Sequence, residues 1–126
     1  LALLESPLGA ALNATATGTL GSLEPLQWKS GSAVTVVLAA ENYPGRPRTG
    51  DAITGAEAEG VLHAGTARKD GVVVSAGGRV LSVVGTGADL DAARIDAYAK
   101  IDAIRLPGSH FRTDIGLAAA EGRISL

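Results

Sequence analysis

The sequence has 126 residues, a formal net charge of −2, two histidines and no cysteine. This length allows one domain with an apolar core of its own, and the lack of cysteine excludes disulfides, cysteine nucleophiles and cysteine-based zinc sites. Basic and acidic residues are interleaved, and apolar runs reach only about half of the ~20 residues that a spanning helix needs. We therefore expect no nucleic-acid partner and no membrane segment.

The first residues form an apolar stretch without an initiator methionine, which indicates a piece of a longer protein. Ser6 followed by Pro7 is a typical helix start, because proline lacks an N–H group that this position does not use. We therefore expect Ser6 to cap a helix that ends at Gly18 and Gly21. Apolar side chains within 1–12 are expected to lie uncovered in the isolated chain, and such patches favour association.

The best strand candidate covers residues 33–40, after a possible short strand start at 26–28. Seven residues of 33–40 are apolar, which predicts a strand with both faces covered. The next segment, 43–50, contains two prolines and two glycines, so it is predicted to be a loop. This loop carries Arg46 and Arg48.

A β-hairpin is predicted farther along the chain. Residues 61–66 read as a strand that pairs with residues 72–75 across the turn at Asp70-Gly71. His63 lies within the first of these apolar strands, where a histidine is usually a hydrogen-bonded core residue rather than a catalyst.

Residues 80–84 are short, apolar and rich in β-branched side chains between glycines, which is typical of a strand. We interpret them as the central strand. Beyond them, apolar residues recur every three or four positions and predict a helix with Asp89 as its N-cap and Pro107-Gly108 as its stop signal. The apolar stripe of this helix consists of Leu90, Ala93, Ala97, Ile101 and Ile104.

The helix also carries charged residues off the apolar stripe. Asp91, Asp96 and Asp102 are predicted to form a solvated face, and Arg94→Ala on the same helix is expected to be nearly silent. The tail, residues 117–126, is predicted to be a short helix that frays.

Arg79 is the leading candidate for a binding role. It follows Gly77 and Gly78 at the start of a strand, where backbone N–H groups and a guanidinium can face the same anion. The alternative, which the local sequence favours, is a strand-edge arginine paired with a surface carboxylate.

Arg112 is the second candidate, in a glycine-bounded loop where its neighbour Asp114 suits an ion pair that holds itself in place. His110 lies in the same loop without a serine, cysteine or carboxylate partner at a suitable spacing. No phosphate-loop, nucleophile-elbow or His-Glu metal pattern occurs. The residues alone therefore predict an α+β domain with anion-binding potential. Its expected form is a small, mostly antiparallel sheet, as a partly closed barrel or sandwich, with one long packed helix.

Several stretches together resemble a known family, the C-terminal portion of glycinamide ribonucleotide synthetase, also called phosphoribosylamine-glycine ligase. They occur in the family's order, and Phe111 stands where a tyrosine is common. The opening residues, 3–8, resemble the helix that follows the family's catalytic metal-binding segment. The matching stretches cover nearly the whole chain and are 33–39 with Tyr43-Pro44-Gly45 and Gly50, 63–66, 77–81 and 111–116.

The resemblance implies an ATP-grasp ligase of purine biosynthesis, which joins glycine to 5-phosphoribosylamine while ATP becomes ADP and phosphate. It implies residues 1–24 as the helical end of the ATP-grasp region and residues 25–126 as the C-terminal ligase domain. ATP and its Mg²⁺ or Mn²⁺ are then held upstream, so the resemblance implies no catalytic or metal-binding residue here and an inactive isolated piece. A cytoplasmic location is expected from the pathway.

Related purine enzymes carry Gly-Arg-Lys-Met-Gly at the start of the corresponding strand, and that arginine grips the phosphate of the substrate. By this resemblance the expected phosphate-binding residues are Arg79, Gly78 and Arg112. Valine and leucine replace the lysine and methionine of the motif, which removes one cation and leaves Arg79 as the first candidate. A hypothesis from another class is a non-catalytic scaffold or binding module, of the kind appended to carboxylases. Such a module would not need either arginine.

Overall fold

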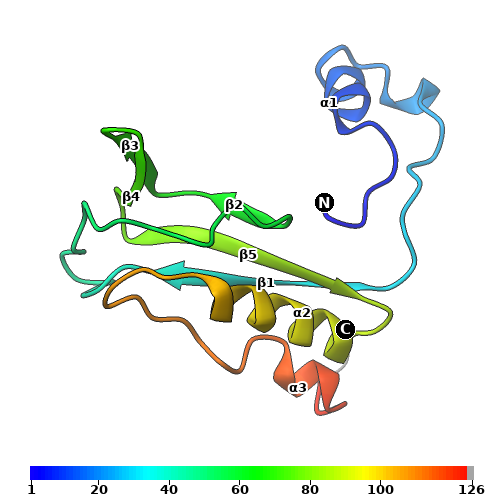
Figure 1. Ribbon diagram of the computed structural model, residues 1–126. Coiled ribbons are helices and arrows are strands. Elements are labelled where there is room, and N and C mark those ends of the chain that lie inside the picture. Colours follow the sequence, from blue (N-terminus) through cyan, green and yellow to red (C-terminus); the bar gives the residue numbers. More distant parts are fainter. Residues whose placement is uncertain (125–126) are drawn as a thin grey trace.

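The computed structural model describes residues 1–124 and combines one long helix with two small antiparallel sheets (Figure 1). Within these residues no helix is long and apolar enough to cross a membrane. The helices are α1 (Leu8–Ala16), the 3₁₀ turn η1 (Leu20–Ser22), α2 (Leu90–Ala103) and α3 (Leu117–Ala120). The strands are β1 (Ser32–Ala39), β2 (Val61–His63), β3 (Thr66–Lys69), β4 (Val72–Ser75) and β5 (Arg79–Gly87).

The larger sheet has the strand order β1-β5-β2, so β5 is the central strand, as predicted. β5 pairs antiparallel with β1 along its whole length and with β2 at residues 81–83. The helix α2 follows β5 directly and packs on one face of this sheet (Figure 1). The predicted α+β class, with an antiparallel sheet and one long packed helix, is confirmed.

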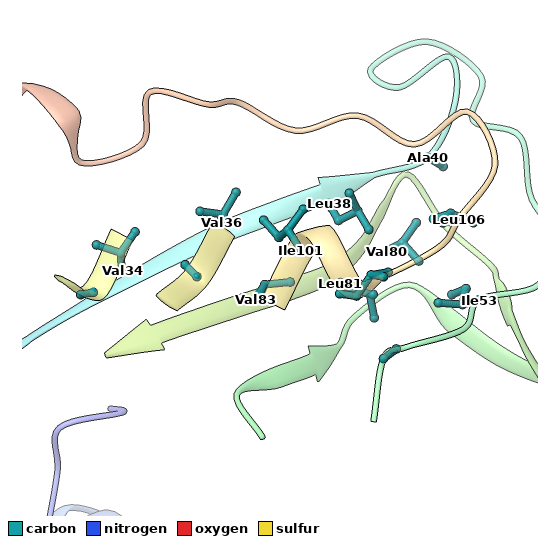
Figure 2. Close-up of a cluster of buried hydrophobic side chains, with 14 residues drawn as sticks. Val34, Val36, Leu38, Ala40, Ile53, Val80, Leu81, Val83, Ile101 and Leu106 are labelled. Carbon is teal, nitrogen blue, oxygen red and sulfur yellow. The ribbon is translucent and has the colours of Figure 1, made fainter. Parts of the chain in front are cut away.

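The core lies between this face of the sheet and α2. Figure 2 shows Val34, Val36 and Leu38 of β1 on the same side as Ile101 of α2. Gly85 of β5 lets the helix approach closely, since a Cβ there would lie 2.2 Å from the Ala93 carbonyl oxygen. The predicted apolar stripe of α2 is confirmed, because four of its five residues are buried: Ala93, Ala97, Ile101 and Ile104.

The opposite face of the larger sheet is open, and the prediction that β1 is covered on both faces is wrong. Burial alternates along β1, and Ala33, Thr35 and Val37 are exposed. The exposed alanine and valine explain the error, because an apolar run predicts two covered faces even where a helix covers only one. We call this uncovered side the open face.

The predicted hairpin is also corrected. Residues 61–66 divide at Gly65: β2 pairs with β5, and β3 pairs with β4 across Asp70-Gly71. Gly65 crosses β5 so closely that a Cβ would lie 2.7 Å from the carbonyl oxygen of Arg79. His63 is not a core residue but an exposed one, with Nδ1 3.2 Å from the Thr66 hydroxyl.

The N-terminal segment stands apart from the sheet (Figure 1). Ser6 does not cap α1: its hydroxyl accepts the backbone N–H of Gln27 at 2.7 Å, and Pro7 occupies the cap position. Residues 26–28 form no strand but a single bridge, between Trp28 and Leu4. The apolar side chains of 1–12 include exposed ones, as expected; their effect on association stays a prediction.

The polar residues of α2 differ from one another more than predicted. Asp89 caps the helix as expected, accepting the Ala92 N–H at 2.8 Å. Asp96, however, is not simply solvated: it accepts the Thr86 N–H at 3.0 Å, and its neighbour Lys100 donates to the Val84 carbonyl at 2.9 Å. Lys100 and then the Thr86 N–H hold the pKa of Asp96 below its usual value. The two side chains thus bond backbone groups of β5, the Thr86 N–H and the Val84 carbonyl, beyond the part of β5 that pairs with β2.

The tail contains a short helix, α3, as predicted, although only for residues 117–120. Residues 125 and 126 of the predicted tail helix lie outside the described residues. Gly116 precedes α3 with a left-handed backbone, φ 72°, which suits glycine.

Candidate functional site

A β-bulge at the start of β5 turns Arg79 toward the open face. Two successive residues of β1 pair with Leu81 and Arg79, so Val80 is an extra residue on β5. Regular alternation would put Arg79 on the helix side together with Leu81. A bulge shifts that alternation by one residue. Arg79 accordingly lines a pocket with Val37 and Ser82 of the open face.

The pocket is an open hollow of about 510 Å³ at one end of the larger sheet. Three parts of the chain form it: strands β1 and β5, the loop after β1, and the crossing between β2 and β3. Its lining residues are Val37, Tyr43, Ala64, Gly65, Gly78, Arg79 and Ser82.

Backbone hydrogen bonds fix the floor of this pocket. The N–H groups of Ala64 and Gly65 both donate to the Val80 carbonyl at 3.0 Å, and Ala76 donates to the Gly65 carbonyl at 2.7 Å. The Gly78 carbonyl in turn accepts the N–H of Ala40 at 2.8 Å. The chain before Arg79 is therefore held from both sides.

Gly78 has a steric reason to be glycine. A Cβ at this position would lie 2.3 Å from the ring of Tyr43, which packs across it. Tyr43 begins the predicted loop 43–50, and the structure confirms that this segment contains no helix or strand. The loop is braced by Arg48, which binds Asp51 at 2.7 Å and also bonds Glu41.

The polar groups at this end of the pocket have no protein partner. Among residues 1–124, the Arg79 guanidinium makes no ion pair or hydrogen bond, so the alternative of a surface carboxylate partner is not realised. The half-buried Gly77 and Gly78 also donate no N–H hydrogen bond within the described chain. The hollow is thus lined by two residues with donors unpaired among residues 1–124, the guanidinium of Arg79 and the N–H of Gly78, and the unpaired N–H of Gly77 lies one residue earlier in the chain.

Arg112 is in the opposite situation. Its Nε and Nη2 donate to the Asp114 carboxylate at 2.8 and 2.6 Å, which confirms the predicted pair. The hydrogen bonds from Arg112 hold the pKa of Asp114 below its usual value, and Asp114 raises the pKa of Arg112. Arg112 does not line the pocket of Arg79. His110 of the same loop pairs through its backbone with Ala39, at the outer edge of β1.

The loop that carries Arg112 is clamped to α2 by two side chains. The Tyr98 hydroxyl donates to the Arg112 carbonyl at 2.7 Å and accepts the Ile115 N–H at 3.2 Å. Arg94 donates to the carbonyls of Ile115 and Thr113, with its guanidinium carbon 5.3 Å from the centre of the Tyr98 ring.

Arg94 is only 9% exposed, and these contacts argue against the expectation that Arg94→Ala is nearly silent. Arg94 and Tyr98 are four residues apart, and this spacing places them on one face of a helix. That spacing was the available signal for the clamp. The loop that they bind has no regular secondary structure, so no periodicity in the sequence indicated their partner.

A larger hollow on the open face, of about 1290 Å³, lies between the N-terminal residues and the sheet. Its charged groups include Asp96 and Lys100, which are paired with each other at 2.7 Å and with the edge of β5. The other charged residues of its lining, Lys29 and Glu59, have opposite signs, so the hollow has no excess of positive charge and is a weaker candidate for an anion site than the pocket at Arg79.

The pocket at Arg79 is equipped for binding rather than for acid-base chemistry. Its lining includes an arginine, a serine and a tyrosine but neither a carboxylate nor a histidine. Residues 1–124 also contain no group of three or more His, Asp or Glu side chains placed to hold a metal ion. A guanidinium beside free backbone N–H groups matches the geometry of a phosphate or carboxylate ligand.

Comparison with known proteins gives a consistent family. Residues 33–118 match the family model described as phosphoribosylglycinamide synthetase, C domain. A phosphoribosylamine–glycine ligase from Mycobacterium tuberculosis is 70% identical over 127 residues, and one from Corynebacterium ammoniagenes is 57% identical over 129 residues. Each alignment covers all of this chain, and the chain spans about 30% of the length of these curated relatives.

A solved structure agrees with these sequence matches. The crystal structure of phosphoribosylamine–glycine ligase from Thermotoga maritima superposes with a TM-score of 0.72 and 42% sequence identity. The match covers 82% of this chain and 27% of that one.

Proposed function

The chain belongs to the phosphoribosylglycinamide synthetase C-domain family, and from this premise we propose that it is the C-terminal domain of a ligase that joins glycine to 5-phosphoribosylamine. In this proposal the domain closes one side of the substrate site and holds the phosphate of the sugar. The wider reaction converts ATP to ADP and phosphate.

The observation that carries the proposal is the set of unpaired donors at the Arg79 pocket. A phosphomonoester presents several anionic oxygens, which suit a guanidinium fork and nearby N–H groups. Arg79 would bind two of these oxygens, and the Gly77 and Gly78 N–H groups are free to donate to them. Arg112 is a weaker candidate, because Asp114 already occupies its Nε and Nη2.

In the proposed reaction, this chain positions the sugar phosphate. The glycine carboxylate takes the γ-phosphoryl group of ATP, ADP leaves, and the sugar amine then attacks the acyl phosphate, losing a proton as phosphate departs. The described residues do not fit a metal site, so we assign Mg²⁺ or Mn²⁺, together with ATP and glycine, to parts of the ligase outside this chain. Fixing the phosphate would orient the attached amine for attack, which lowers the entropic part of the barrier.

We also propose the division into residues 1–24, as the end of an ATP-grasp region, and residues 25–126, as the ligase domain. In the structure, Lys29 donates to the Leu3 carbonyl at 2.8 Å and Glu5 to the Gln27 carbonyl at 2.9 Å. These backbone bonds join residues 27 and 29 to the N-terminal segment, so they do not support a division between residues 24 and 25, and this proposal rests on the resemblance. A cytoplasmic location stays a prediction from the pathway.

The test is steady-state kinetics of the full-length ligase with Arg79→Ala. A charge-assisted contact contributes about 1.5–3 kcal/mol, so the apparent affinity for phosphoribosylamine should fall about ten- to a hundredfold. Apparent affinities for ATP and glycine should change little. Arg79→Lys should restore only part of the loss, because an ammonium cannot form the two-pronged contact.

Arg68→Ala is the matched control, since Arg68 is an exposed strand arginine that, within residues 1–124, bonds only the Gly71 carbonyl. An Arg79→Ala enzyme with unchanged dependence on the sugar phosphate and a lowered melting temperature would make Arg79 structural and Arg112 the leading ligand. Full-length protein without any glycine-dependent ATP hydrolysis would favour the scaffold hypothesis.

A further inference from the structure

The pocket at Arg79 contains one strand hydroxyl, that of Ser82, and we propose that this hydroxyl selects a sugar phosphate over inorganic phosphate. The inference rests on the proposed function and deepens it, because it assigns the second half of the ligand. Ser82 would exchange a hydrogen bond with a sugar hydroxyl while Arg79 holds the phosphate.

The surroundings of Ser82 support this role. Ser82 lies directly opposite Val37 of β1 on one side and Leu62 of β2 on the other. Both neighbours are apolar and exposed, at 38% and 56%. Ser82 is therefore a lone hydroxyl in an apolar strip that crosses all three strands of the open face.

The hydroxyl of Ser82 is also free. It is half-buried, and among residues 1–124 it makes no hydrogen bond to the protein. Valine or isoleucine would fit this half-buried position of the pleated surface better than serine. A ligand group supplies the partner that the protein does not.

The distance to Arg79 fits a molecule longer than phosphate. Ser82 follows Arg79 by three residues, and the bulge at Val80 leaves both on the open face. Strand residues rise about 3.3 Å each, so the two Cα atoms lie roughly 7–10 Å apart. A sugar phosphate can reach both side chains with its two ends, whereas inorganic phosphate can reach only one.

The experiment uses the full-length ligase and measures, by isothermal titration calorimetry, its binding of ribose 5-phosphate and, separately, of inorganic phosphate. Ser82→Ala should weaken ribose 5-phosphate about three- to tenfold, as expected for one hydrogen bond between uncharged groups, and leave inorganic phosphate unchanged. Arg79→Ala should weaken both ligands. Thr86→Val is the control, because Thr86 is an exposed hydroxyl on the same strand that does not line the pocket.

The outcomes separate this inference from the proposed function. If Ser82→Ala changes both ligands equally or neither of them, while Arg79→Ala weakens both, the role of Ser82 is overturned and the phosphate site stands. If Arg79→Ala changes neither ligand, or if the unmodified ligase binds neither, the phosphate site and the role of Ser82 both fail.

Discussion

Two regions of this domain each present an arginine after an irregular stretch of chain, and they differ in how their polar groups are used. In the loop 111–116, Arg112 bonds Asp114, and Tyr98 and Arg94 of α2 bond the loop backbone. At the start of β5, neither the Arg79 guanidinium nor the N–H groups of Gly77 and Gly78 bond any of residues 1–124.

The difference teaches how to separate structural arginines from binding arginines. Polar groups that shape a fold are paired, because an unpaired buried donor costs free energy. Arg79 is exposed, so water can satisfy its guanidinium; the pocket at Arg79 is distinguished because this guanidinium and the Gly78 N–H, both unpaired within the described residues, belong to residues that line the same hollow. By this criterion the loop 111–116 is a finished structural unit, and the pocket at Arg79 is the place where binding is expected.

The largest stability effect should come from breaking the clamp with Arg94→Ala. The substitution removes charge-assisted bonds to the Thr113 and Ile115 carbonyls and leaves those acceptors unsatisfied in a partly buried place. We expect a loss of about 2–4 kcal/mol in the free energy of unfolding, measured by urea denaturation. Arg79→Ala, measured in the same way, should change it by less than about 0.5 kcal/mol.

An Arg94→Ala protein as stable as the parent would show that the clamp is not the support of the loop. Tyr98→Phe tests the other half, since it keeps the ring under the guanidinium and removes only the hydroxyl bonds to Arg112 and Ile115. Its cost should be smaller, about 1–2 kcal/mol.

A smaller effect is expected from breaking the other region with Gly78→Ala. The added methyl group would meet the Tyr43 ring at 2.3 Å, and such overpacking costs about 1–3 kcal/mol. The cause can be isolated by a double-mutant cycle, in which Gly78→Ala in a Tyr43→Ala background should cost much less. If the cost is the same in both backgrounds, the ring is not the reason for the glycine.

The sequence predicted the parts of this fold that depend on local pattern. The strand 80–84 was readable from its β-branched side chains between glycines. The apolar stripe of the following helix was readable because burial against a single partner imposes a regular period. The Asp89 cap was readable because its acceptor and donor are three residues apart.

The sequence did not predict features that depend on distant partners. The division at Gly65 follows from its crossing with Arg79, and the buried position of Arg94 follows from a loop about twenty residues later. The site was found in part: Arg79 and Gly78 follow a local pattern, whereas the bulge at Val80, which turns Arg79 to the open face, depends on the register of β1.

The smallest effect concerns the exposed pair of Arg112 and Asp114. The arginine holds the pKa of Asp114 below its ordinary value of 3.8 in the folded state. Because the folded pKa is the lower one, the contribution of the pair is present above the ordinary value and is lost as the pH falls through the folded value. Arg112→Ala should return the Asp114 pKa toward 3.8, as measured by NMR titration of the carboxyl carbon, with less change in melting temperature than either Arg94→Ala or Gly78→Ala.

The same titration with saturating inorganic phosphate sharpens the comparison of the two regions. If phosphate binds beside Arg79, the Asp114 pKa should stay where it is, because Arg112 keeps its carboxylate partner. Phosphate that instead engaged Arg112 would displace Asp114 from the guanidinium and raise its pKa toward the ordinary value. Such a rise, absent from the Arg112→Ala protein, would make the paired arginine the ligand and contradict the rule that free donors identify the site.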